Sequence, residues 1–195
     1  MKKRPQWLNG IAGGPAEDYF SGMKPKLLMI FALFSLVTTR GSAQAPPARL
    51  DHSMVSFFSG EWKGEGAFAN ARPIAATLSF RLSLDSAWLV SDHADLPPND
   101  YKATSYWGVD ATTGQFVATV FDNFHGHRNF ASSGWAAGRL VLTTESFAPG
   151  AGTYFEHFIY ERKSDTQFRM TYETSRDGIA WQVGDSLLFT KTRPS

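Results

Sequence analysis

The 195-residue chain contains no cysteine, which excludes disulfide bonds, thiolate catalysis and cysteine metal ligands. It also lacks an apolar run of the ~18 residues that a comfortable membrane span requires; a clearly shorter run covers residues 27–37. No glycine-rich phosphate loop precedes a helical pattern, and no Gly-x-Ser-x-Gly motif marks a hydrolase nucleophile. Enzymatic activity therefore has no positive support in the sequence. We favour the hypothesis that the protein is not an enzyme.

The short apolar run lies in the setting of a cleavable export signal. Lys24 and Lys26 precede it, and Ala43 and Ala45 follow it in an Ala-x-Ala pattern. This order of a positive segment, an apolar segment and a small-residue cleavage site is typical of secretory signals. We therefore expect residues 23–45 to be a signal peptide. The mature protein is then periplasmic or secreted, with no stable membrane anchor after cleavage.

The residues on either side of the expected signal peptide are an N-terminal extension and one domain. Residues 1–22 are polar and precede the expected signal, so we interpret them as a misassigned extension before a true start at Met23. Residues 46–195 carry 13 basic and 16 acidic side chains, a net charge of −3. The basic character of the whole chain thus comes from the part removed, and no basic stripe indicates nucleic acid binding. About 150 residues are one domain of ordinary size.

The hydrophobic pattern of this domain predicts one short helix followed by many strands. Leu50, Met54, Phe57 and Phe58 recur at helical spacing, which predicts a helix over 50–59. Beyond it, alternation with period two and turn residues at short intervals predict an antiparallel, up-and-down all-β barrel of about ten strands. A sandwich is the alternative. The predicted strands are 61–68, 74–82, 88–95, 101–109, 116–122, 127–133, 139–146, 153–163, 167–174 and 181–191.

Two motifs carry a resemblance to known families. The pattern Gly-x-Trp-x-Gly-x-Gly at residues 60–66 resembles the first strand of lipocalin-like (calycin) barrels, and its extended form resembles the nitrobindin-like haem-binding barrels. The sequence Tyr-Trp-Gly-Val-Asp at 106–110, followed by Phe116 and Asp122, is similar to an uncharacterised lipocalin-like bacterial family known only as a domain of unknown function. The nitrobindin resemblance implies a haem-ligating histidine on a late strand. Residues 167–191 contain none, which leaves His157 as the substitute and indicates no cofactor.

Five residues are candidates for ligand contact. Trp107 belongs to the aromatic set that either lines a pocket or fills the barrel, and Trp62 either plugs a barrel end or reaches a ligand. Asp122, His125 and His157 are polar groups able to fix a ligand's orientation. His157 alternates with apolar neighbours, so we expect it to point inward.

A metal site is the less favoured alternative for the histidines. His125 and His127 are two residues apart and share a face in an extended chain, and His93 would complete a set of three nitrogen ligands. The opposing interpretation is that His125 and His127 are polar loop residues.

Three functions stay open at this stage. The leading hypothesis is non-covalent binding of a small apolar or amphipathic molecule inside the barrel. The second is a haem-binding or enzymatic barrel of the same architecture. The third is a filled barrel that acts as a structural or partner-binding module. The sequence does not predict the ligand's identity or the oligomeric state.

Overall fold

The computed structural model describes residues 49–148, 150 and 152–193. The extension at 1–22 and the expected signal peptide at 23–45 lie outside these described residues. Within the described ranges, no helix is long and apolar enough to cross a membrane.

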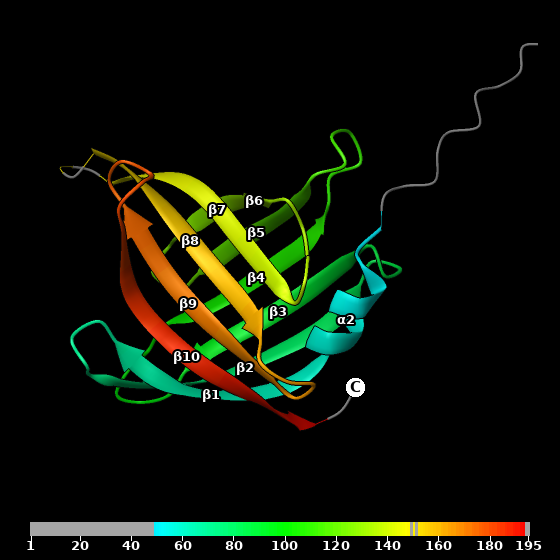
Figure 1. The fold of residues 1–195 in the computed structure, drawn as a ribbon, viewed down its shortest axis with the longest axis horizontal. Helices are drawn as coiled ribbons and strands as arrows, with labels where there is room; N and C mark the ends of the chain where they lie inside the picture. Colours follow the sequence, from blue (N-terminus) through cyan, green and yellow to red (C-terminus); the bar gives the residue numbers. More distant parts are fainter. Residues whose placement is uncertain (1–48, 149, 151, 194–195) are drawn as a thin grey trace, which may run out of the picture. The chain divides into compact units, whose positions relative to one another are not determined.

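Ten strands form one closed antiparallel barrel in which neighbours in sequence are neighbours in space (Figure 1). The last strand pairs with the first, so none of these ten strands lies at an open edge of the sheet. The predicted all-β, up-and-down barrel is confirmed, and every predicted boundary agrees to within two residues. The elements are α2 (His52–Phe58), β1 (Gly60–Phe68), β2 (Pro73–Ser83), β3 (Trp88–Asp95), β4 (Lys102–Val109), β5 (Phe116–Asp122), β6 (His127–Ser132), β7 (Arg139–Ala148), β8 (Gly152–Arg162), β9 (Gln167–Ser175) and β10 (Trp181–Arg193).

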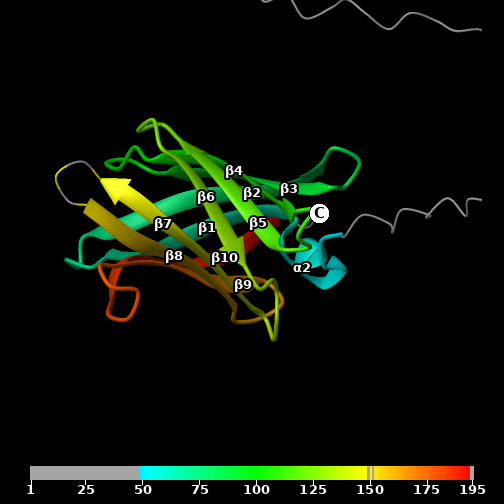
Figure 2. The ribbon, with the colours of Figure 1, turned by 90° about the horizontal axis from the view of Figure 1, so that it is seen from above.

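Helix α2 covers one end of the barrel, which we call the closed end (Figures 1 and 2). The helix begins where the Asp51 side chain accepts a hydrogen bond from the Met54 amide at 2.9 Å. It buries Phe57 and Phe58 among the aromatic rings at the base of the barrel. The indole N–H of Trp62 on β1 donates a hydrogen bond to the carbonyl oxygen of Phe58 at 2.7 Å. The helix is therefore attached to the first strand as well as packed on the core.

The opposite end, which we call the open end, is formed by the other set of strand connections. The described connections there are the turns at 69–72, 96–101, 123–126 and 176–180. Figures 1 and 2 place these turns away from α2. Because side chains alternate along each strand, every second residue of a strand points into the barrel. The inward-pointing side chains near α2 are tightly packed aromatic rings, whereas the inward-pointing side chains near the open end include many polar groups.

Two glycines of β1 bring the first and last strands close enough to close the barrel. A Cβ atom on Gly66 would lie 1.9 Å from the carbonyl oxygen of Ser186 on β10. A Cβ atom on Gly64 would lie 2.6 Å from the ring of Phe189 on the same strand. The motif at residues 60–66 therefore has a physical meaning, because its tryptophan fills the closed end and its glycines leave room for β10.

Candidate functional site

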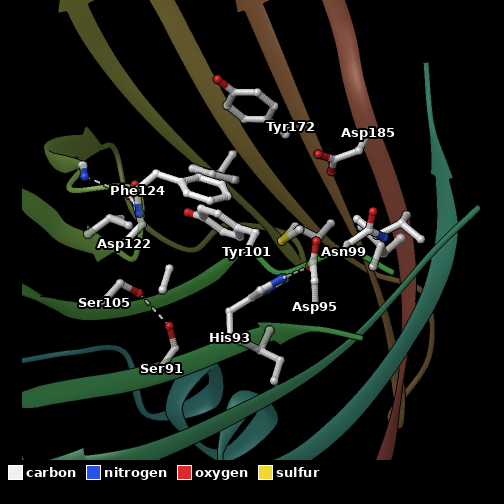
Figure 3. A pocket seen from close by; sticks show the side chains of 18 of the residues that line it. Ser91, His93, Asp95, Asn99, Tyr101, Ser105, Asp122, Phe124, Tyr172 and Asp185 are labelled. Carbon is white, nitrogen blue, oxygen red and sulfur yellow. Dashed lines mark hydrogen bonds and ion pairs between the residues drawn. The ribbon is translucent and has the colours of Figure 1, made fainter. Parts of the chain in front are cut away.

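A cavity of about 640 Å³ lies between the packed closed end and the turns of the open end. This volume falls in the range of pockets that hold drug-sized molecules. Its apolar wall comes from several strands and includes Ile74, Leu78, Val120, Leu142, Phe158 and Met170. Many of its charged groups belong to two clusters, one centred on Arg128 and the other on Asp185. Figure 3 shows residues of both clusters around the same space.

The first cluster contains a buried carboxylate that is fully hydrogen bonded. Glu156 on β8 has no solvent exposure, and the Arg128 guanidinium on β6 lies 2.6 Å from its Oε2 atom. The Tyr172 hydroxyl donates to the same oxygen at 2.9 Å, and the Ser146 hydroxyl donates to Oε1. Burial and then the charge of Glu156 raise the pKa of Tyr172 far above its ordinary value. Tyr172 therefore stays protonated and continues to donate.

The other amino group of Arg128 completes the same cluster. Its Nη2 atom lies 3.1 Å from Oδ2 of Asp122 and donates to the Tyr101 hydroxyl at 3.3 Å. Burial alone would lower the pKa of the guanidinium, but the charge of Glu156 raises it above its ordinary value. Arg128 is therefore a permanent cation that is already paired with two carboxylates. Both of its Nη atoms are engaged, whereas its Nε atom is buried without a hydrogen-bond partner.

The second cluster lies on the other side of the cavity, where His93 and Asp95 on β3 face Asp185 on β10 (Figure 3). Nε2 of His93 lies 2.8 Å from Oδ1 of Asp95, which is buried. Asp185 differs because its Oδ1 atom is buried without a hydrogen-bond partner. Burial raises the pKa of Asp185 to about 6, with His93 opposing the shift and Asp95 adding to it.

Two of the five predicted site residues line the cavity. Trp107 forms its floor, and its indole N–H donates to Oγ of Ser105 at 2.8 Å. Asp122 lies at the open end, where it accepts hydrogen bonds from the amides of Phe124 and Gly126 at 3.0 and 2.8 Å. These bonds fold the turn at 123–126, so Asp122 shapes the rim of the cavity as well as pairing with Arg128.

The other three predicted residues do not line the cavity. Trp62 is almost fully buried at the closed end, where it plugs the end of the barrel. His125 is exposed in the turn at 123–126, with a left-handed φ of 65°. His157 lies on the outer wall, with its ring 3.4 Å from that of Trp181 and nearly parallel to it. The expected inward direction of His157 is wrong because its neighbour Glu156 takes the inward position.

The structure does not support the two alternatives considered for the histidines, a haem held by His157 and a metal held by His93, His125 and His127. His157 faces away from the cavity, so the residues do not fit a haem held by this histidine inside the barrel. His93 points inward, whereas His125 is in a turn and His127 stacks on Phe121 on the exterior. Within the described part of the chain, no group of three or more histidine, aspartate or glutamate side chains is arranged to hold a metal ion.

Three charged residues of the two clusters, Asp185, Arg128 and Glu156, were not among the residues predicted from the sequence. Asp185 alternates with the buried Leu187, and Arg128 alternates with the buried Phe130. A charged side chain in phase with an apolar face is a signal that could have identified both. Glu156 gave no such signal, because both faces of β8 are largely apolar and the pattern does not tell inside from outside.

The sequence matches no family model, and no curated protein is similar to it. One solved structure that resembles the fold is a redesigned β-barrel. It is 13% identical, with a TM-score of 0.32, and the match covers 72% of this chain and 95% of the other. A likeness at this level adds nothing to the barrel described above.

Proposed function

We propose that this protein binds one small, largely apolar molecule non-covalently inside its barrel. The observation that carries the proposal is the cavity of about 640 Å³, which is walled by aliphatic and aromatic side chains and reaches the open end. Burial of an apolar ligand there removes its surface from water, and the few polar groups restrict its orientation. A barrel that served only as a filled structural module would be packed with side chains and would not need such a cavity.

The arrangement of the two ends supports a binding role. The closed end is stabilised by edge-to-face aromatic pairs, such as Phe58 with Trp107 and Trp62 with Phe168, so no ligand enters there. At the open end the rings of Tyr101 and Phe124 lie 5.9 Å apart beside the cavity. Ligand exchange therefore takes place between the turns of the open end. Membership of the lipocalin-like group is part of this proposal and is supported by the up-and-down barrel and the motif at 60–66.

Export belongs to the same proposal and is supported by the sequence of residues 23–45 alone. N-terminal sequencing of the protein recovered from outside the cytoplasm tests it. A new N-terminus at residue 46 is the expected result, and an intact Met1 would contradict both the signal and the suggested start at Met23.

Binding is tested with N-phenyl-1-naphthylamine, an uncharged dye that fluoresces in apolar surroundings. Titration into the purified protein should give a saturable signal. Ala103→Phe, which places a ring in the cavity, should weaken binding at least about fivefold. Ala94→Phe is the matched control, because Ala94 lies on the neighbouring strand β3 at a half-buried position that does not line the cavity. The proposal fails if the dye does not saturate the wild-type protein, or if both variants weaken binding equally.

A further inference from the structure

Asp185 is a charged group for which the protein itself supplies no partner. It projects from β10 into the cavity, as Figure 3 shows, and its Oδ1 atom is buried without a hydrogen bond. Among the described residues, no lysine, arginine or histidine nitrogen lies within ion-pairing distance of it. Asp185 as a residue is half-buried, but a buried carboxylate oxygen without a hydrogen bond is unfavourable, so its presence in a ligand cavity points to a partner supplied from outside.

The groups around Asp185 leave this side of the cavity short of positive charge. Phe68 on β1 and Tyr172 on β9 flank it in the sheet. In the same cluster, His93 on β3 is engaged with Asp95, a second carboxylate that faces the same space. Burial, with a further contribution from Asp185, raises the pKa of Tyr160 far above its ordinary value, so this phenol adds no charge.

The arginines of the cavity do not correct this imbalance. The Arg128 guanidinium is held by Glu156 and Asp122 in the other cluster. The Arg72 guanidinium lies over the ring of Phe68, 4.4 Å from its centroid, and makes no ion pair with Asp185. An anionic ligand placed beside Asp185 would therefore meet an unpaired carboxylate, because Arg72 is exposed and neither arginine pairs with it. A cationic ligand would satisfy the carboxylate directly.

We infer that the cavity selects an amphipathic organic amine, whose protonated nitrogen pairs with Asp185 while its apolar part lies against the aromatic wall. This inference rests on the proposed function, because it requires the cavity to bind a ligand at all. A charge-assisted hydrogen bond to a poorly hydrated carboxylate is stronger than a neutral one. The rings of Tyr172 and Phe158, whose centroids are 5.0 Å apart, add aromatic surface that favours a cation.

The inference is tested with three ligands that share an apolar group and differ in charge. These are 2-(1-naphthyl)ethylamine, 2-(1-naphthyl)ethanol and 1-naphthylacetate, titrated by calorimetry at about pH 7.5. The wild-type protein should bind the amine at least about tenfold more tightly than the alcohol, and the acid more weakly than either. Asp185→Asn should reduce the preference for the amine to less than about threefold while leaving the affinity for the alcohol unchanged. Asp85→Asn, an equal change of charge in the turn after β2, should keep the wild-type preference.

The outcomes separate this inference from the proposed function. If the uncharged dye binds in the cavity but the amine has no advantage over the alcohol, the inference is overturned and the binding function stands. An amine preference that survives Asp185→Asn also overturns the inference. If neither the dye nor any naphthyl ligand binds, both proposals are overturned.

A second measurement decides the matter if Asp185→Asn does not fold. Because burial raises the pKa of Asp185 to about 6, the wild-type carboxylate becomes protonated in mild acid, whereas the aliphatic amine keeps its charge. The titratable groups that face Asp185 are His93, Asp95, Tyr160 and Tyr172. The ratio of amine to alcohol affinity should fall severalfold between about pH 7.5 and about pH 5. A ratio that does not change with pH overturns the inference.

Discussion

The Arg128 guanidinium lies 2.6 Å from Oε2 of Glu156, so the one fully buried carboxylate in the described part of the barrel is paired with a cation. This pair joins β6 to β8 across β7, which lies between them in the sheet. The carboxylate of Glu156 also offsets the positive charge of Arg128, which would otherwise attract anions to the cavity. The same contact therefore stabilises the wall and influences the ligand chemistry.

Arg128→Met should destabilise the protein by about 3 kcal/mol, because it leaves Glu156 buried with only neutral donors. Adding Glu156→Gln to this variant should recover at least about 1 kcal/mol, since the uncompensated charge is then removed. Urea denaturation measures both values. Arg139→Met is the control, because its contact with Glu161 at 3.8 Å is solvent-exposed and should contribute less than about 1 kcal/mol. Equal losses for Arg128→Met and Arg139→Met would contradict this account.

Gly66→Ala should be among the most damaging small substitutions in the barrel. Its Cβ would meet the backbone of Ser186, which cannot move without separating β1 from β10. We expect a loss of about 3 kcal/mol or more in the free energy of unfolding, or failure to fold. Gly114→Ala should cost only about 1 kcal/mol, because nothing lies within 4 Å of its Cβ and only its left-handed φ of 70° is unfavourable. Thermal unfolding followed by circular dichroism compares the two, and a similar loss for both would reject the close-approach explanation.

His157→Ala should lower stability slightly without changing ligand affinity. The imidazole stacks on Trp181 on the outer wall, and loss of this contact should cost about 1 kcal/mol. Burial lowers the pKa of His157, with Glu173 partly opposing the shift, so the ring stacks mainly in its neutral form at neutral pH. Dye affinity should stay within about twofold of wild type, whereas Ala103→Phe weakens it. A large loss of affinity in His157→Ala would restore this histidine as a site residue.

The sequence predicted the barrel well because local signals determine it. Period-two alternation and turn residues marked all ten strands, and the motif at 60–66 indicated which strand begins the barrel. The structure places Trp107 and Asp122 in the cavity lining, and their contact with a ligand stays a prediction. These features depend on residues close together in the chain.

The charged contacts of the cavity depend on residues far apart in the chain, which alternation alone does not bring together. Arg128 and Glu156 meet only because three consecutive strands pair in a particular register. His157 was assigned to the wrong face because Phe155 and Ile159 beside it are as apolar as the residues that point inward. A shift of one residue in the assumed phase exchanges the two faces of a strand.

Asp185→Asn should stabilise the ligand-free protein even though it removes the proposed amine contact. The pKa of Asp185 is raised to about 6 by burial, so the folded protein binds a proton there more tightly than the unfolded chain does. At about pH 4 the carboxyl group is largely protonated in the folded state, and the variant and wild type should be nearly equal in stability. As the pH rises through about 6, the wild type must ionise a poorly solvated group and loses stability that the variant keeps.

The advantage of Asp185→Asn should therefore grow between about pH 4 and about pH 7 and then level off at between about 1 and 3 kcal/mol. Urea denaturation at several pH values measures it, and the dependence on urea should have the same slope in both proteins. Asp85→Asn should show no such growth, because Asp85 is exposed in a turn. Saturating 2-(1-naphthyl)ethylamine should reverse the order, since it stabilises only the protein that keeps the carboxylate. An advantage that is largest in acid would mean that Asp185 is stabilised, and not destabilised, in its charged form.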